Sequence, residues 1–229
     1  MAGSRNVGDA VCSPAYYFDF SQPCAVVRFG KEPIPQCDAV IFGGGAIGNS
    51  IGNVAAATPA RIKIAWGLGE TRHGRMEASP APSGFDLYGS RDWGQEGAEW
   101  VPCASCMSPL FDMQREALHD SVLYYNLRRP RPSVKGITAE HNEVSFDAAI
   151  DFLASGSTVV TNSYHGAYWA TLLGRSVVVV DAYSSKLHQF RHRPAYGQQE
   201  KASRYPDALA EARDANRAFF ARVMDRLTP

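Results

Sequence analysis

Short apolar runs that end at a glycine or a polar residue recur along the chain and predict buried β-strands. Strands that are apolar on both faces belong to parallel sheets with helices on their surfaces. Such runs are found at six places, residues 39–42, 61–66, 85–88, 121–125, 158–161 and 176–180. The pattern therefore predicts an α/β fold with mostly parallel sheets.

Helical patterns are fewer, and we expect three helices. Residues 145–154 carry apolar side chains at helical spacing, and Ser145 is suited to cap the first turn. Residues 166–173 are apolar nearly all round, which predicts a buried helix. Residues 206–227 form a long amphipathic pattern that begins at Pro206, a residue favoured in a first helical turn.

A basic, proline-rich stretch at 128–135 interrupts these elements and is the best candidate for a domain boundary. We therefore expect an N-terminal α/β lobe at 1–127 and a reduced C-terminal α/β lobe at 128–205. The helix in the segment 206–229 is expected to pack back on both lobes.

Charge and hydropathy narrow the class of protein. The 229 residues include 23 Lys and Arg against 23 Asp and Glu, a balance that argues against a nucleic-acid partner. The longest strongly apolar run, 176–180, is far shorter than the ~20 residues that cross a bilayer. The start of the chain shows no basic-then-apolar signal segment, so we expect a cytoplasmic protein without a membrane span. The sequence leaves open whether the protein is a homo-oligomer.

The five cysteines are odd in number and scattered, which is a poor disulfide framework. Cys103 and Cys106 have the CxxC spacing of a zinc or redox centre. Zinc needs four ligands, and no second pair of ligands with suitable spacing follows. Pro102 and Pro109 flank the pair, which disfavours a redox motif at a helix start. A structural loop is the favoured interpretation, and a metal or redox centre is the alternative.

Ligands of parallel α/β proteins bind at the carboxyl ends of the strands, so the loops there are the candidate site. Two glycine-containing loops could let a ligand approach the backbone closely. One is the segment Asn6, Val7, Gly8 and Asp9, and the other is Gly43, Gly44 and Gly45 after the first strand. An ordinary tight turn is the alternative for both. The glycine loop matches no nucleotide-binding fingerprint.

Charged and polar residues follow three later strands. Arg91, after the run 85–88, could grip a carboxylate or phosphate, although a surface pair with Asp92 is the alternative. After the run 158–161 comes the block Thr161, Asn162, Ser163, Tyr164, His165 and Gly166. The N–H groups of the following helix would favour an anion there, and His165 could act as a general acid or base. Lys186, after the run 176–180, should lie at the same edge of the sheet as His165.

Taken together and in this order, these motifs resemble the polysaccharide pyruvyl transferase family. The resemblance rests on ordered elements up to about residue 190: Asn6-Val-Gly-Asp9, Phe42-Gly-Gly-Gly45, Gly67-Leu-Gly69, Ser90-Arg-Asp92, Thr161-Asn-Ser-Tyr-His-Gly166 and Ser185-Lys186. It implies a two-lobed fold similar to GT-B glycosyltransferases. It also implies transfer of pyruvate from phosphoenolpyruvate onto two sugar hydroxyls as a cyclic ketal, without a metal or cofactor.

The resemblance also suggests a role for each candidate residue. His165 is the expected acid and base, and the loop of Asn162, Ser163 and Tyr164 with Gly166 would cradle the donor phosphate. Arg91 and Lys186 would balance the donor's charge. The acceptor sugar would face Asp9, the second expected catalytic residue, with Asn6 and Gly8 beside it, and the loop of Gly43, Gly44 and Gly45.

Two other functions stay open. A GT-B glycosyltransferase that uses a nucleotide-sugar would share the fold and the histidine in its loop, but the sequence has no clear base-stacking or ribose-binding signature. A non-catalytic carbohydrate-binding protein is also possible. Ser163 stands where characterised pyruvyl transferases often carry an arginine, and this difference favours the non-catalytic alternative.

Overall fold

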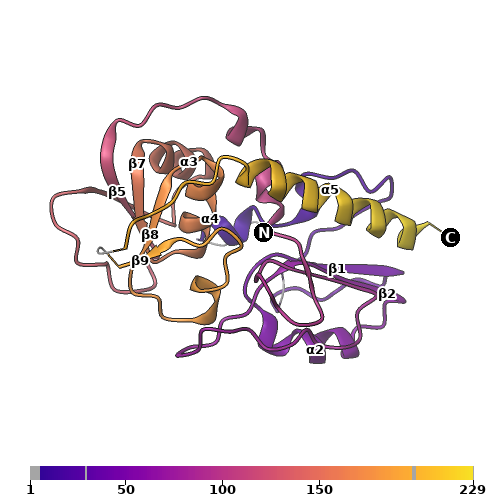
Figure 1. Cartoon of the computed structure of the whole chain (residues 1–229). Helices are drawn as coiled ribbons and strands as arrows, with labels where there is room; N and C mark the ends of the chain where they lie inside the picture. The colour runs from indigo at the N-terminus through magenta and orange to yellow at the C-terminus, as the bar shows by residue number, and fades with distance from the viewer. Residues whose placement is uncertain (1–5, 29, 198–199, 229) are drawn as a thin grey trace.

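The chain folds into two parallel β-sheets with helices packed on them (Figure 1). The computed structural model describes residues 6–28, 30–197 and 200–228. The expectation that no signal segment opens the chain concerns residues 1–5, which lie outside the described residues. The last residue of the segment 206–229 also lies outside them. The predicted α/β class with mostly parallel sheets is confirmed, because every pairing between the named strands is parallel.

The first sheet has four strands in the order β1-β2-β3-β4. They are β1 (Ala39–Gly43), β2 (Ile62–Leu68), β3 (Leu87–Ser90) and β4 (Glu99–Trp100). Within β2 the register shifts at Gly67, whose φ of 62° is a left-handed conformation that suits glycine. The helix α2 (Gly48–Ala57) joins β1 to β2. This helix was not predicted, because its glycine and asparagine residues obscure the helical pattern.

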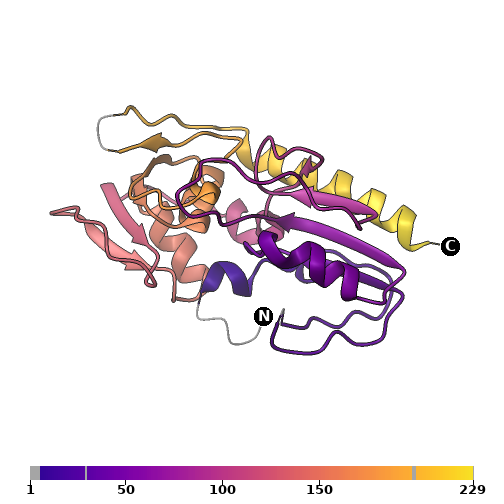
Figure 2. The same cartoon turned by 90° about the horizontal axis from the view of Figure 1, so that it is seen from below.

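The first sheet is buried on both faces. One face of β2, including Ile64 and Trp66, packs against Phe219 of the C-terminal helix. The other face, including Leu68, packs against Ile51 of α2. Accordingly, α2 and the C-terminal helix lie on opposite sides of this sheet (Figures 1 and 2).

The second sheet has five strands in the order β6-β5-β7-β8-β9. They are β5 (His119–Tyr125), β6 (Thr138–His141), β7 (Gly156–Thr161), β8 (Ser176–Val179) and β9 (Ala195–Tyr196). The helices α3 (Phe146–Ala154) and α4 (Tyr164–Leu172) cover one face over Tyr124 and Val159. The short segments around Val134 and Ala202 cover the other face. Among the described residues, no helix contributes to the apolar cluster on that face.

The division between the sheets differs from the predicted boundary at residue 128. The strand β5 lies within the predicted N-terminal lobe, yet it pairs with β6 and β7 of the second sheet. The short helix α1 (Val7–Ala10) also belongs with the second lobe, where Val7 N donates to Asn142 O at 2.9 Å. The basic stretch after β5 is therefore a loop within the second lobe.

The C-terminal helix α5 (Ala208–Leu227) packs on both lobes. Its start, at Ala208 and Ala212, belongs to the core of the second lobe, and its end covers the first sheet through Phe219. Buried Asn216 accepts a hydrogen bond of 2.8 Å from Trp66 Nε1 of β2. In the part of the chain that the structure describes, no helix is long and apolar enough to cross a membrane.

Short 3₁₀ helices occupy four of the connections. They are η1 (Pro14–Tyr16), η2 (Ala104–Met107), η3 (Pro109–Asp112) and η4 (Ser185–Leu187). The first lies between α1 and β1, the next two link the lobes, and η4 follows β8.

Candidate functional site

The candidate site lies where loops from the two sheets meet. From the first lobe come Gly69, after β2, and Arg91, after β3; a Cβ on Gly69 would lie 2.3 Å from Arg91 Nε. From the second lobe come Tyr164 and His165 at the start of α4. The guanidinium of Arg91 lies 3.8 Å above the centre of the Tyr164 ring, which joins the two groups of residues.

Arg91 is a buried cation with free hydrogen-bond donors. Only 3% of the residue is exposed, and within the described residues its Nε and Nη1 have no hydrogen-bond partner. An arginine remains charged at any physiological pH, so burying it without a partner for these donors is costly. This arrangement is expected where an anionic ligand supplies the missing acceptors.

His165 is packed into the same place. Gly8 of α1 approaches it so closely that a Cβ would lie 1.9 Å from its Nδ1. The rings of Tyr164 and Trp169 are 5.3 and 5.0 Å away, centre to centre. Its Nε2 is buried and has no partner among the described residues. Burial, together with the positive charges of Arg91 and Lys186, holds the pKa of His165 well below its usual value, so the imidazole is neutral.

Asp92 and the residues beside it complete the first-lobe side of the site. Asp92 Oδ2 accepts a hydrogen bond of 2.7 Å from Glu70 N. Burial raises the pKa of Asp92 to about 6, although Arg91 acts in the opposite direction. Ser185 Oγ accepts from Arg72 N at 3.1 Å and donates to Glu70 O at 3.3 Å, so the loop before Lys186 is fastened to the loop after β2.

Lys186 lies on the His165 side of the molecule, as the parallel order of β7 and β8 predicted. Its positive charge affects the pKa values of both His165 and Asp92. Its Nζ is 5.1 Å from the centre of the Tyr183 ring. The side chain is only partly buried and so lies at the edge of the site.

The N-terminal segment contributes a small polar network. Asn6 caps α1 by accepting from Gly8 N at 3.2 Å, and it donates to Asp9 Oδ2 at 3.0 Å. Asn142 Nδ2 also donates to Asn6 Oδ1 at 3.0 Å. This network holds Gly8 against His165, and Asp9 is close enough to act electrostatically on Arg91.

The glycine loop after β1 packs against the segment that follows α1. A Cβ on Gly44 would lie 2.3 Å from Cys12 Sγ, and one on Gly43 would lie 2.6 Å from Pro14. Gly44 and Gly45 have positive φ values of 66° and 79°. The close approach that Gly43 and Gly44 allow is therefore to the protein's own chain, which is the tight-turn alternative, whereas a Cβ on Gly45 would meet nothing within 4 Å.

The loop after β7 uses most of its polar groups internally. Asn162 Oδ1 accepts from Asn126 N at 2.8 Å. Ser163 caps α4 by accepting from Gly166 N at 3.3 Å. The expectation that the Gly166 N–H points outward to an anion is thus wrong, because the helix cap already occupies it. A Cβ on Gly166 would also lie 2.6 Å from the Tyr124 ring.

The Cys103 and Cys106 segment packs beneath α4. Tyr168 Oη donates to Cys103 O at 3.0 Å, and Trp169 Nε1 donates to Ser105 Oγ at 3.0 Å. Burial raises the pKa of Cys106 to about 12, with smaller effects from its neighbours. These contacts agree with a structural loop.

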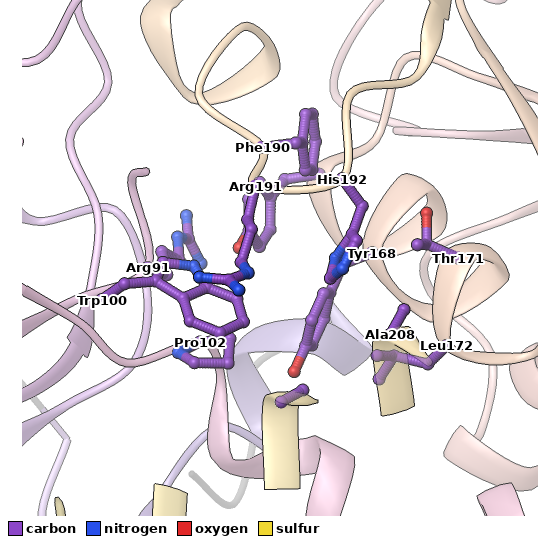
Figure 3. A pocket seen from close by; sticks show the side chains of 12 residues that line it. Arg91, Trp100, Pro102, Tyr168, Thr171, Leu172, Phe190, Arg191, His192 and Ala208 are labelled. Carbon is purple, nitrogen blue, oxygen red and sulfur yellow. The ribbon is translucent and has the colours of Figure 1, made fainter. Parts of the chain in front are cut away.

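A small pocket opens beside Arg91 (Figure 3). Arg91 and Trp100 line one side and Tyr168 lies across from them. Its volume of about 20 Å³ suffices for roughly one water molecule. A larger ligand can reach Arg91 only if the surrounding loops move apart.

Comparison with protein-family models, curated proteins and solved structures finds no match for this chain. The site therefore has to be interpreted from its own geometry. That geometry brings together Gly8, Arg91, Tyr164, His165 and Lys186. It leaves Asn162 and the loop of Gly43, Gly44 and Gly45 in structural contacts.

Sequence reasoning assigned no role to Asp92, Glu70 or Ser184, all of which are buried at the site. Asp92 and Glu70 follow the ends of β3 and β2, and this position could have been a signal for both. Ser184 Oγ has no partner within the described residues, and no sequence pattern distinguishes it from a surface serine.

Proposed function

We propose that the chain is a pyruvyl transferase with a two-lobed fold of the GT-B type. It would transfer the pyruvyl group of phosphoenolpyruvate to a saccharide in polysaccharide biosynthesis and form a cyclic ketal. The observation that carries the proposal is the buried guanidinium of Arg91, with free donors at Nε and Nη1, beside the free Nε2 of His165.

The donor's chemistry matches these groups. Phosphoenolpyruvate carries a carboxylate and a phosphate, and the free Nε and Nη1 of Arg91 lie on different edges of the guanidinium, so each can donate to a separate anionic oxygen. Lys186 would add a second positive charge at the edge of the site. The ring of Tyr164 holds Arg91 in place without neutralising it, so the guanidinium remains available to the anion.

Ketal formation requires one proton to reach C3 of the donor while a sugar hydroxyl adds to C2. A second hydroxyl then adds to C2 as the bond to the phosphate oxygen breaks, and its proton leaves with the phosphate. His165 would supply the proton to C3 as general acid. It is neutral in the free protein, and the negative charge of the donor would raise its pKa so that it takes up a proton on binding.

The acceptor saccharide would enter from the side of Asp9, which lies in α1 next to Gly8. The reaction needs no metal or cofactor, and phosphoenolpyruvate is available in the cytoplasm, where we place the protein. Entry of a substrate to Arg91 would require the loops around it to move apart, because the pocket beside it has a volume of only about 20 Å³.

Calorimetric titration of the purified protein with phosphoenolpyruvate, nucleotide-sugars and free glycans tests the proposal. We expect phosphoenolpyruvate to bind and to draw a proton from the buffer, which appears as a binding enthalpy that changes with the buffer's ionisation enthalpy. Arg91→Met should abolish this binding. Binding of a nucleotide-sugar alone would favour a glycosyltransferase, and binding of glycans alone would favour a carbohydrate-binding protein.

A further inference from the structure

Asp92 is a rigidly held carboxylate with one oxygen left free. It is the second residue after β3, and 2% of the residue is exposed. Two of its polar groups are already used within the fold. Its backbone N–H donates to Ser90 Oγ at 3.0 Å, and its Oδ2 accepts from Glu70 N at 2.7 Å. Its Oδ1 is buried and has no partner among the residues that the structure describes.

The buried guanidinium of Arg91 is next to Asp92 in the sequence but does not pair with its free oxygen. Both residues are buried, yet in the described part of the chain they form no ion pair with each other. A pair needed only for stability would satisfy these atoms mutually, since an unpaired buried charge is expensive. Each residue instead keeps free polar atoms, donors on Arg91 and an acceptor on Asp92.

These two sets of free atoms suit two different substrate groups. The donors of Arg91 fit the anionic groups of phosphoenolpyruvate, whereas a carboxylate oxygen would repel that anion. Asp92 Oδ1 fits a hydroxyl group, which can donate a hydrogen bond to it. Acceptor hydroxyls must also lose their protons for the ketal to form. Asp9, the catalytic residue expected on the acceptor side, already accepts a hydrogen bond of 3.0 Å from Asn6 Nδ2 at its Oδ2.

We infer that Asp92 is the general base that removes the proton from the first acceptor hydroxyl; this inference rests on the proposed pyruvyl transfer. The hydroxyl oxygen forms a bond to C2 of the donor while its proton passes to Asp92 Oδ1. His165 gives a proton to C3 in the same step. After product release Asp92 returns its proton to water, and His165 takes up another with the next donor.

The electrostatic surroundings of Asp92 agree with this role. Burial raises its pKa to about 6, while Arg91 and Lys186 favour the ionised form and Glu70 opposes it. Tyr164 and Tyr88 are the other titratable groups that interact with it. Asp92 is thus ionised at neutral pH and has a pKa near the operating range, which suits general base catalysis.

The test is Asp92→Asn, with Asp86→Asn as a matched control. An asparagine oxygen can still accept from Glu70 N, so the variant keeps the structural bond and loses the base. Asp86 makes the same kind of contact, accepting from Lys63 N at 2.8 Å, but it is exposed and lies at the start of β3. Asp86→Asn therefore makes the same chemical change, at a residue that accepts the same kind of backbone hydrogen bond but lies outside the site.

We expect Asp92→Asn to bind phosphoenolpyruvate at least as tightly as the wild type, because a negative charge near the anion is removed. Its kcat should fall by roughly 10²–10⁴-fold, and the inflection near pH 6 in the rate profile should disappear. Asp86→Asn should match the wild type in both. Unchanged turnover and pH profile in Asp92→Asn, with donor binding intact, would overturn the role of Asp92 alone. A wild-type protein that does not bind phosphoenolpyruvate would overturn the proposed function itself.

Discussion

Replacing Gly8 with alanine tests whether catalysis depends on the position of His165. The new Cβ would lie 1.9 Å from Nδ1 of the imidazole, 2.4 Å from Cγ and 2.6 Å from Cε1. An ordinary contact begins at 3.4 Å, so the ring or the backbone has to move by about 1.5 Å. Little room exists for this movement, because the ring is packed against Tyr164 and Trp169, and the backbone of α1 is tied to Asn142.

Two effects on stability oppose each other in Gly8→Ala. Overpacking a buried site costs about 1–3 kcal/mol, whereas alanine is favoured over glycine within a helix by up to about 1 kcal/mol. The free energy of unfolding should therefore fall by about 0–3 kcal/mol. Turnover should fall much more, by roughly 10²-fold, since a displacement of about 1 Å is enough to disturb a catalytic geometry.

The assays are urea unfolding and phosphate release from phosphoenolpyruvate in the presence of the acceptor. Gly52→Ala is the control: it lies in α2, where its Cβ would meet only Pro82, at 3.1 Å. The control should keep wild-type turnover. If Gly8→Ala also turned over at the wild-type rate, the packing of Gly8 against His165 would have no role in positioning the imidazole.

Four further predictions concern single groups of the site and of the cysteine loop. His165→Ala should lower turnover by roughly 10²–10⁴-fold and keep the fold by circular dichroism; full activity or unfolding would mean a structural histidine. Lys186→Ala should weaken phosphoenolpyruvate binding by about 1.5–3 kcal/mol in calorimetry, and unchanged affinity would remove Lys186 from the site. Because the pKa of Asp92 is raised to about 6, its ionisation destabilises the fold as the pH rises above about 4. Asp92→Asn should therefore be about 2–3 kcal/mol more stable than the wild type at pH 7 and equal to it near pH 3, as measured by urea unfolding. Cys103 and Cys106 should bind no metal, and stoichiometric zinc in elemental analysis of protein purified without chelator would contradict this.

Local sequence patterns were enough to predict most of the regular structure. The apolar runs correspond to β1, β2, β3, β5, β7 and β8, because burial on both faces requires apolar side chains within each strand. Ser145 caps α3 by accepting from Ala148 N, as its residue type and position predicted. The parallel order of β7 and β8 followed from the helix between them. This order predicted that Lys186 and His165 lie at one edge of the sheet.

Other features depended on contacts between distant parts of the chain. The pairing of β5 with β7 assigned that strand to the second sheet, although the proline-rich stretch after it had suggested a domain boundary. The contact between Gly8 and His165 joins residues that are far apart in sequence.

The sequence by itself determined most of the segments that become strands and helices, and which loops lie at the carboxyl ends of the predicted strands. These properties depend on side chains within a few residues of one another. Only the tertiary structure decided which polar atoms of those loops are used in the fold and which stay free. It left donors on Arg91 and an acceptor on Asp92 without partners in the described chain. Whether a buried polar atom finds a partner from a distant part of the chain depends on the packing of the whole molecule, so no local pattern can reveal it.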